Sequence, residues 1–443
     1  MKSFPRGIHL EYQKDKTKNL PIREMPAPKR VVIPLQQNLG CPNDPLVKVG
    51  DEVVEGQKIG EAQKFVGAPV HASISGKVVQ IEKLPNPCGF DVASVVIESQ
   101  STEYRVQSTD QRDLDELTPE EIRKIVREAG IVGLGGATFP THVKLTPPKD
   151  KNIDTLIING CECEPYITAD HRIMLERCED VVYGARAIAK AVGAEKIIIG
   201  IEDNKPDAIQ KLKSEILNSK SKTNSKFEIQ MLKTKYPQGG EKQLIKAVLN
   251  REVPSGGLPL DVGVVVQNVG TAAAVAEAIR FGTPLIKRVI TVTGSGVKNP
   301  QNLLVRIGTS FAEVVEQCGG LAEDATKIIM GGPMMGLAVS SLDLPVVKGT
   351  TCILVLNKKE AKVYEEKNCI RCGRCIKACP IGLMPNFIAL YAKIKDWEKT
   401  EEYHVADCIE CGCCAYVCPS RINLVQYFKV AKRELQIRKA VCR

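Results

Sequence analysis

The spacing of apolar positions changes several times along the chain, and each change marks the edge of a predicted domain. Residues 29–98 carry short runs of Val and Ile separated by Gly, Pro and Asp, a pattern that indicates an all-β domain of short strands. Residues 1 to about 30 are polar and proline-rich without sustained periodicity, and we expect them to wrap the surface. Residues 100–117 are polar and are predicted to be a linker.

A helix is predicted to begin at the next change of pattern. Thr118 can serve as its N-cap, Pro119 occupies the first helical position and Glu121 the third, which together make a capping box. The residues that follow repeat at helical spacing and give the helix an apolar face. A glycine-rich loop at residues 130–141 comes after it.

Strand-like and helix-like segments then alternate. Buried strands are predicted at residues 154–159, 196–201, 227–232 and 262–267, and helices at residues 181–192, 206–217, 241–250 and 272–281. Alternation at this spacing predicts a parallel sheet with helices on its faces. The Lys- and Ser-rich stretch at 219–225 is predicted to be a surface loop.

The pattern changes once more after this region. A strand at 289–293 ending in a glycine turn, a short helix at 310–317 and a strand at 353–356 resemble a small β-grasp module. We therefore expect a multidomain α/β protein with four domains, at residues 1–117, 118–285, 286–358 and 359–443.

Composition and charge exclude several classes of protein. The chain of 443 residues is 43% hydrophobic and 26% charged, and its net charge of +9 is spread along the sequence without a nucleic-acid recognition motif. No stretch approaches the roughly 18–20 apolar residues of a membrane span. Residues 1–5 do not lead into the apolar segment of a signal peptide.

The densest basic region is the C-terminal tail, residues 421–443. Four apolar residues fall on one line of its predicted helix, and most basic residues lie off that line. The apolar line comprises Leu424, Phe428, Ala431 and Leu435. The tail is either a helix that docks on an acidic partner or an anionic membrane, or a helix that packs on its own domain with a solvated basic face.

Two cysteine runs with one shared pattern lie in the last predicted domain. Each has three cysteines separated by two residues, then a fourth after three more residues, followed by proline. The first run is Cys369, Cys372, Cys375 and Cys379, and the second is Cys408, Cys411, Cys414 and Cys418. In two-cluster ferredoxins the fourth cysteine of each run ligates the other cluster.

This pairing predicts two [4Fe–4S] clusters. Cys369, Cys372, Cys375 and Cys418 are expected to hold one, and Cys408, Cys411, Cys414 and Cys379 the other. Zinc sites or disulfides are the alternative, but zinc usually takes two spaced pairs of Cys or His. The chain has 17 cysteines, most of the others scattered singly, which favours a reducing cytoplasm over a disulfide scaffold.

The N-terminal β domain resembles the carrier-like β-barrel, or barrel-sandwich hybrid, of biotinyl and lipoyl carriers. Residues 45–53 and 69–78 are similar to the two halves of that barrel. Carriers present a modified lysine at the turn between the halves, whereas residues 72–74 of this chain read Ala-Ser-Ile. We expect the fold without the swinging arm, and His71 as a turn or core residue.

The glycine-rich loop does not fit a dinucleotide-binding fingerprint, because it follows a helix and precedes a strand. It can still expose backbone N–H groups to a phosphate and a flat ring, or it can be a simple turn. After the next strand comes an acidic turn that carries Asn159, Glu162, Glu164 and Tyr166. Parallel α/β sheets bind ligands at this end of their strands.

Four segments together resemble the flavin cradle of the NADH-binding flavoprotein subunit of respiratory complex I. These cradle segments are residues 133–141, 159–166, 236–241 and 267–271. With a carrier-like barrel before them, a β-grasp (SLBB-like) module after them and a two-cluster ferredoxin-like α domain at the end, the chain resembles the C subunits of Rnf complexes. Unlike the complex I subunit, it has Cys161 and Cys163 in the acidic turn; these are either redox-active or metal-binding, or small buried side chains.

The resemblance implies the fold and the site residues of a Rossmann-like flavin/NADH domain. The backbone of Gly133, Gly135, Gly136 and Ala137 would hold phosphate and ribityl oxygens, and Lys144 would neutralise phosphate charge. Asn159, Asn268 and Thr271 would bond the flavin, as would the neighbouring Gln267. Glu162, Glu164 and Glu241 would bond cofactor hydroxyls or amides, and Tyr166 or Phe139 would stack on a ring. Gly240 opens the helix whose positive end faces the anionic cofactor.

The resemblance implies an oxidoreductase subunit that exchanges hydride between NAD(H) and non-covalent FMN and single electrons through two [4Fe–4S] clusters. No side-chain nucleophile or base is expected, because the cofactors carry the chemistry. The implied partners are the other Rnf subunits, NADH and, through the complex, ferredoxin, with Na⁺ or H⁺ translocated and this subunit peripheral on the cytoplasmic face of the bacterial membrane. The alternatives are a soluble reductase such as a cobalamin reductase, a non-catalytic electron-wiring subunit, or a metal-storage or zinc scaffold.

Overall fold

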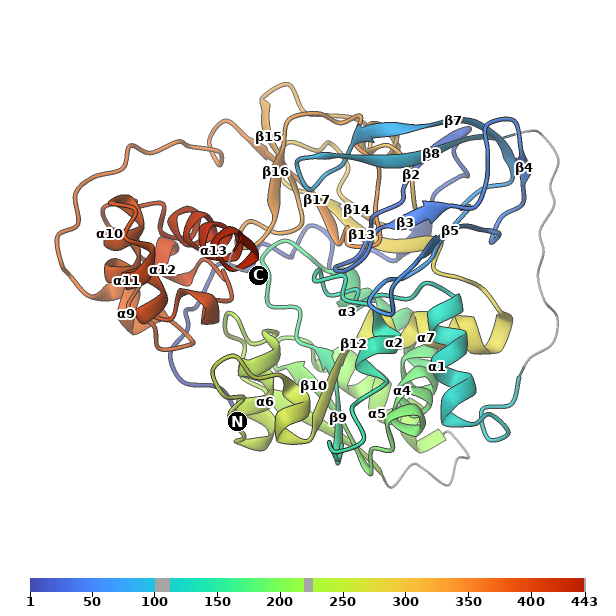
Figure 1. Cartoon of the computed structure of the whole chain (residues 1–443), viewed down its shortest axis with the longest axis horizontal. Coiled ribbons are helices and arrows are strands. Elements are labelled where there is room, and N and C mark those ends of the chain that lie inside the picture. The colour runs from blue at the N-terminus through green and yellow to red at the C-terminus, as the bar shows by residue number, and fades with distance from the viewer. Residues whose placement is uncertain (100–111, 219–225, 442–443) are drawn as a thin grey trace.

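The computed structural model describes residues 1–99, 112–218 and 226–441, which form four groups of elements along the chain (Figure 1). The predicted surface loop at 219–225 and most of the predicted linker at 100–117 lie outside the described residues.

The N-terminal group contains two antiparallel sheets. One has the order β2 (Arg30–Pro34), β8 (Asp91–Ser99), β7 (Gly76–Pro85) and β4 (Glu52–Val53), and the other the order β3 (Asn43–Pro45), β5 (Lys58–Ala62) and β6 (Val70–His71). Val31, Ile59 and Ile97 are fully buried in their shared core. His71 is a core residue, as expected, and burial lowers its pKa to about 3.

The second group is built on the predicted parallel sheet. Its order is β11 (Phe227–Leu232), β10 (Lys196–Glu202), β9 (Thr155–Gly160) and β12 (Val264–Asn268), and all three pairings are parallel. Successive strand residues face opposite sides, so Leu156 and Ile158 pack in one core and Ile157 in another.

Helices cover both faces of this sheet. The face of Leu156 packs against α4 (Cys178–Val192), α5 (Pro206–Asn218) and α7 (Val269–Phe281), and the opposite face packs against α6 (Glu241–Leu249). The capping box predicted at Thr118 is present at the start of α1 (Pro119–Glu128). Two short helices were not predicted, α2 (Thr141–Lys144) and α3 (Ala169–Glu176), as was a 3₁₀ turn at Pro259–Val262.

The third group is a six-stranded sheet that includes one strand from the N-terminal arm. Its order is β1 (Ile22–Glu24), β14 (Gln301–Arg306), β13 (Lys287–Thr293), β17 (Cys352–Asn357), β15 (Ala325–Met330) and β16 (Leu337–Val339). The predicted helix is α8 (Phe311–Gln317), whose N-cap Ser310 forms a capping box with Glu313.

The N-terminal arm lies on the surface for most of its length, as expected, but several of its apolar residues are buried. Phe4, Ile8 and Leu10 are buried, with exposed fractions of 3%, 8% and 8%. Lys2 forms an isolated bridge with β11, Ile8 forms another with Tyr236, and β1 pairs in parallel with β14. The arm therefore crosses the other groups and buries a few side chains against them. The arm contacts a different group at each point along its length. Its buried apolar residues therefore have no regular spacing.

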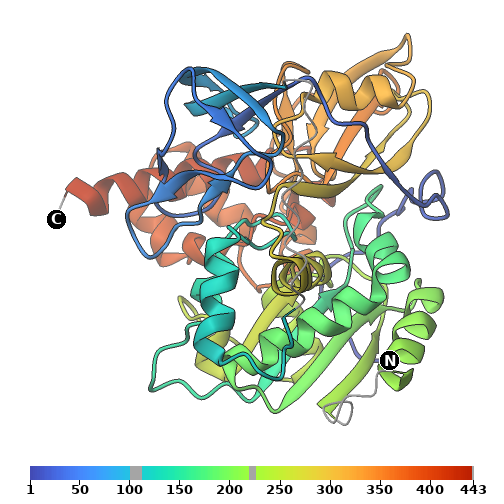
Figure 2. The same cartoon turned by 90° about the vertical axis from the view of Figure 1, so that its right-hand side faces the viewer.

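The C-terminal group is helical and lies to one side of the molecule (Figures 1 and 2). It contains α9 (Arg374–Ala378), α10 (Pro385–Lys393), α11 (Trp397–Glu402), a 3₁₀ turn at Val405–Asp407, α12 (Cys413–Tyr416) and α13 (Leu424–Val441). The apolar line of α13 is buried in this domain's own core, which confirms self-packing for that face. Among the described residues, no helix combines the length and apolarity needed to cross a membrane.

Candidate functional site

Four cysteines from two distant segments line one cavity of the C-terminal domain. Cys369, Cys372 and Cys375 come from the first cysteine run, and Cys418 follows α12. These four residues, called the outer set below, are the first combination that the crossed pairing predicts. Cys369 and Cys372 are exposed to solvent.

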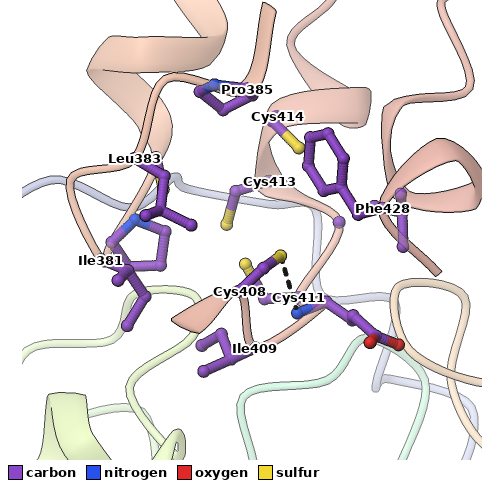
Figure 3. A pocket seen from close by; sticks show the side chains of 14 residues that line it. Ile381, Leu383, Pro385, Cys408, Ile409, Cys411, Cys413, Cys414 and Phe428 are labelled. Atoms are coloured by element: carbon purple, nitrogen blue, oxygen red, sulfur yellow. Dashed lines mark hydrogen bonds between the residues drawn. The ribbon is translucent and has the colours of Figure 1, made fainter. Parts of the chain in front are cut away.

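The other four motif cysteines line a second cavity. Cys408, Cys411 and Cys414 surround it (Figure 3). Cys379 also lines this cavity, and these four residues form the inner set. The rest of the lining is largely apolar and includes Phe428. Cys411 and Cys414 are each 7% exposed, so the inner set is well shielded from water.

The two cysteine runs repeat the same backbone geometry. The N–H of Arg371 lies 3.4 Å from Cys369 Sγ and the N–H of Glu410 lies 3.3 Å from Cys408 Sγ, each donating to the first sulfur of its run. Arg371 and Glu410 have φ angles of 55° and 57°. This left-handed backbone conformation directs the N–H of each residue toward the first cysteine sulfur of its run. Such N–H donors stabilise thiolates and tune cluster potential.

This geometry fits a cube of iron and sulfide. A [4Fe–4S] cluster takes four thiolates around a body larger than one ion, so its ligands line a cavity rather than meet at a point. Each set offers four sulfurs in that arrangement, and the inner set is also shielded by apolar side chains. Within the described part of the chain, no three His, Cys, Asp or Glu side chains form a group suited to a single metal ion. The ligand assignments stay predictions.

Cys413 also lines the inner cavity but is not part of the predicted ligand sets. Its side chain is fully buried and its sulfur lies 4.0 Å from the main-chain oxygen of Tyr236. Only its position next to Cys414 distinguishes it in the sequence, and motif spacing gives it no role.

The four cradle segments meet at the carboxyl edge of the parallel sheet. Asn159 at the end of β9 is the register partner of Asn268 at the end of β12. The Asn159 amide donates to the Gly239 oxygen at 2.8 Å, and the Asn268 amide donates to Asp170 at 2.7 Å. Both amides thereby tie together the loops that border this edge.

The glycine loop is anchored to the start of α7. The N–H of Leu134 donates to the hydroxyl of Thr271 at 2.9 Å, and a Cβ at Gly135 would lie 3.6 Å from the Asn268 side chain. Gly136 has a φ of +108°, and a Cβ there would meet no atom within 4 Å. The loop thus presents open backbone at Gly136, where a flat or anionic group can approach.

Lys144 and Glu241 form an ion pair across this edge. Lys144 Nζ lies 2.6 Å from Glu241 Oε1 and donates to the Val266 oxygen at 3.1 Å. Lys144 ends α2 and Glu241 begins α6, so the lysine charge sits near the N-terminal end of α6. Both side chains are about one-third exposed, at 31% and 36%, and can reach a ligand.

The acidic turn points its side chains toward other parts of the protein. Buried Glu162 lies 3.5 Å from Lys14 of the arm and accepts from the Asp170 N–H at 2.7 Å. Burial raises the pKa of Glu162 and lowers that of Lys14. These contacts give Glu162 a structural role that the sequence did not indicate, and its predicted cofactor bond stays a prediction.

Glu164 and Tyr166 contact segments beyond the flavin domain. Glu164 accepts from the Met335 N–H at 2.7 Å, and burial raises its pKa to about 7. The Tyr166 hydroxyl donates to Glu360 at 3.2 Å. Phe139 accepts a main-chain bond from Gly133 at 2.8 Å, which closes the glycine loop.

Cys161 and Cys163 are packed inside this region. They are 7% and 8% exposed, and Cys163 Sγ accepts from the Gly239 N–H at 3.3 Å. Burial raises the pKa of both thiols, so they stay protonated. This favours the interpretation of the pair as small buried side chains.

Unpaired amide atoms near the same edge fit a polar cofactor. The Nε2 atoms of Gln267 and Gln238 and the Oε1 atom of Gln243 are buried without a hydrogen-bond partner. Buried polar atoms are rarely left unpaired, so these amides at the end of β12 and at the start of α6 suit a ligand with donors and acceptors. Gln238 and Gln243 were not predicted, because a glutamine near a helix start has no distinctive pattern.

Models of known domain families match the four groups in order. They are an RnfC barrel sandwich hybrid domain at residues 2–102, a Nuo51 FMN-binding domain at 126–277, an SLBB domain at 289–338 and a 4Fe-4S dicluster domain at 359–422. The expected barrel-sandwich, flavin, SLBB-like and two-cluster folds are confirmed. Fold and site together define a flavin and iron–sulfur oxidoreductase subunit.

Curated relatives match the chain over almost its full length. The C subunit of the Na(+)-translocating ferredoxin:NAD(+) oxidoreductase complex of Acetobacterium woodii is 50% identical over 98% of this chain and 97% of its own. The C subunit of the proton-translocating complex of Clostridium ljungdahlii is 49% identical over 98% and 94%, and that of the ion-translocating oxidoreductase complex of Rhodobacter capsulatus is 41% identical over 99% and 84%. The chain belongs to the family of C subunits of ion-translocating oxidoreductase (Rnf) complexes, which confirms the resemblance in the sequence.

Proposed function

We propose that this chain is the NADH-oxidising or NAD⁺-reducing subunit of a ferredoxin:NAD⁺ oxidoreductase complex that translocates Na⁺ or H⁺. It would sit at the cytoplasmic face of a bacterial membrane, held there by the other subunits, and meet ferredoxin only through them. The names of its close relatives and its full-length match to them support this assignment. The observation that carries it is the contact between the FMN-binding domain and the inner cysteine set through Tyr236 and Cys411.

FMN, when bound, exchanges a hydride with nicotinamide and single electrons with iron–sulfur clusters. The chain's task is to hold and orient the reactants. The N–H groups of Gly133 and Leu134 already bond within the protein, so Gly133 is not expected to donate to the phosphate. The backbone N–H groups of Gly135, Gly136 and Ala137 and the charge of Lys144 would hold the phosphate, helped by the N-terminal end of α6. Asn159, Gln267 and Asn268 would hold the ring, with the unpaired amides of Gln238 and Gln243 beside them.

The two cysteine sets would each hold a cluster, which would supply a centre for single electrons. The inner set adjoins the flavin domain, because the Tyr236 hydroxyl bonds to Cys411 and Met334 lies against Gly412. The outer set is exposed at Cys369 and Cys372, on the side open to other proteins. We infer that a cluster held by the inner set would lie between the flavin domain and a cluster held by the outer set.

Anaerobic purification followed by spectroscopy tests this function. The purified chain should show flavin and iron–sulfur absorption, with the flavin bands bleached by NADH. Iron and sulfide analysis separates clusters from zinc, and a protein with clusters but no flavin would be a wiring subunit instead. Purification without any membrane subunit would favour the soluble reductase.

A further inference from the structure

The outer set lies under a strongly basic surface. Residues 367–395 contain six lysines and arginines and no aspartate or glutamate. All six are exposed: Lys367, Arg371, Arg374, Lys377, Lys393 and Lys395. Among the described residues only Lys393 has an ion-pair partner, Glu366. This surface, called the outer basic face, therefore carries an excess of positive charge, and its members Arg371 and Lys393 line the cavity of the outer set.

Exposed apolar side chains lie within the outer basic face. Ile370, between Cys369 and Cys372, is 67% exposed, and Leu390 and Ile394 of the neighbouring α10 region are 51% and 65% exposed. Ile370 and Leu390 both line the cavity of the outer set. An apolar centre with a charged rim is the usual anatomy of a protein–protein interface.

The second cysteine run has the same motif in the opposite environment. Its equivalent of Arg371 is Glu410, which pairs with Lys432 of α13 at 2.8 Å. Its loop is closed by contacts of Cys411 and Gly412 with the flavin and SLBB domains. The inner run thus meets the rest of this chain, and the outer run remains free to meet another molecule.

We propose that the outer basic face docks an acidic electron-transfer protein or domain, whose redox centre exchanges one electron with the cluster of the outer set. This deepens the proposed function and depends on it. One centre is oxidised and the other reduced by a single electron, and no bond or proton is transferred. Opposite charge steers such partners together, and the apolar centre brings the two redox centres close.

An anionic lipid surface would also attract positive charge. It offers no redox centre, and it would cover the exposed cysteines Cys369 and Cys372. The position of the basic residues around Cys369 and Cys372 therefore favours a protein partner.

Stopped-flow kinetics on the anaerobically purified full chain tests the proposal. The probe is a reduced acidic ferredoxin, which stands in for the acidic electron-transfer domain of a partner, and its oxidation by the chain is followed at increasing NaCl concentration. We expect the second-order rate to fall at least about tenfold between 20 and 300 mM salt, because screening removes steering. Arg374→Glu/Lys395→Glu should lower the low-salt rate at least about tenfold. The matched control Arg433→Glu/Arg438→Glu, which changes two exposed residues of α13 by the same charge, should not.

The results separate the possible failures. Equal rates for both double variants, or a rate independent of salt, would overturn the docking proposal. Binding to phosphatidylglycerol vesicles that is lost in Arg374→Glu/Lys395→Glu while the ferredoxin rate is unchanged would assign the face to lipid and also overturn it. Flavin bleaching by NADH is measured in every variant; its absence from the unmodified chain would instead refute the proposed function.

Discussion

The hydroxyl of Tyr236 donates a 2.8 Å hydrogen bond to the main-chain oxygen of Cys411. Tyr236 precedes the glycines that open α6, whereas Cys411 belongs to the inner set, so this bond joins the flavin domain to the iron–sulfur domain. The Tyr236 backbone is held by two further bonds with Ile8 of the arm, each 2.9 Å long. The tyrosine is 1% exposed, and burial raises its pKa, which keeps the hydroxyl a donor.

Tyr236→Phe should weaken the contact between these two domains. The Cys411 oxygen would lose its donor in a buried place, which costs about 1–3 kcal/mol. We expect normal flavin and iron content and normal NADH-dependent flavin reduction, but slower reduction of the clusters in rapid freeze-quench spectroscopy. Tyr403→Phe removes the same atom within the iron–sulfur domain, where the ring stacks on Phe387, and serves as the control. Equal cluster kinetics in both variants would contradict this role of Tyr236.

Loss of one outer-set cysteine should interrupt electron flow without affecting the flavin. Cys372→Ala is expected to lose about half of the bound iron, because one of two predicted clusters has only three ligands left. NADH should still bleach the flavin, while transfer to a downstream acceptor should stop. Cys413→Ala, a buried cysteine outside the motif, should retain the full iron content. If the Cys372 variant still passes electrons to the downstream acceptor, the outer set does not lie on the electron-transfer route.

Lys144→Gln should weaken FMN binding. Removing a charge from a phosphate contact should raise the dissociation constant about tenfold, equivalent to about 1.4 kcal/mol. Titration of flavin fluorescence against the flavin-free protein measures the change. Lys246→Gln removes a lysine from the middle of α6 that pairs with Glu252 and should leave the constant unchanged. If both variants bind FMN equally well, Lys144 has no part in holding phosphate.

Local repeats made much of the fold predictable from the sequence. Alternating strand and helix patterns predicted the bounds of all four strands of the parallel sheet to within two residues. The doubled cysteine run predicted the two sets of four cysteines that line the two cavities. Spacing along the chain determines such features. The start of α7 was missed by three residues, because its N-cap Asn268 was interpreted as a ligand residue only.

Contacts between distant segments could not be predicted in this way. The arm's Lys14 meets Glu162 across nearly 150 residues, and neither residue stands in a pattern that reveals the other. The same holds for Tyr236 and Cys411, and for the unpaired amides of Gln238 and Gln243. These contacts depend on how the domains pack against each other, and the periodicity of one segment does not predict that packing.

Lys348 joins three domains without a charged hydrogen-bond partner. Its Nζ donates to the oxygens of Pro69 in the barrel and Gly130 after α1, each at 2.7 Å, and its own backbone lies between β16 and β17. The side chain is 1% exposed, and burial lowers its pKa to about 7. A neutral amine has two N–H groups, one for each of these carbonyls.

Lys348→Met should therefore change how stability depends on pH. Between about pH 7 and the pKa of roughly 10.4 that lysine has when unfolded, the folded state binds fewer protons, so this residue's contribution to stability increases as the pH rises. We expect the thermal midpoint of the unmodified chain to exceed that of the variant by an amount that grows from pH 7 to pH 9.5. At pH 9 the difference should correspond to about 2–4 kcal/mol, because two buried carbonyls lose their donors. Lys64→Met changes an exposed lysine of the barrel, and its thermal midpoint should equal that of the unmodified chain at every pH. Parallel pH profiles for Lys348→Met and the unmodified chain would mean that the amine is charged in the folded protein.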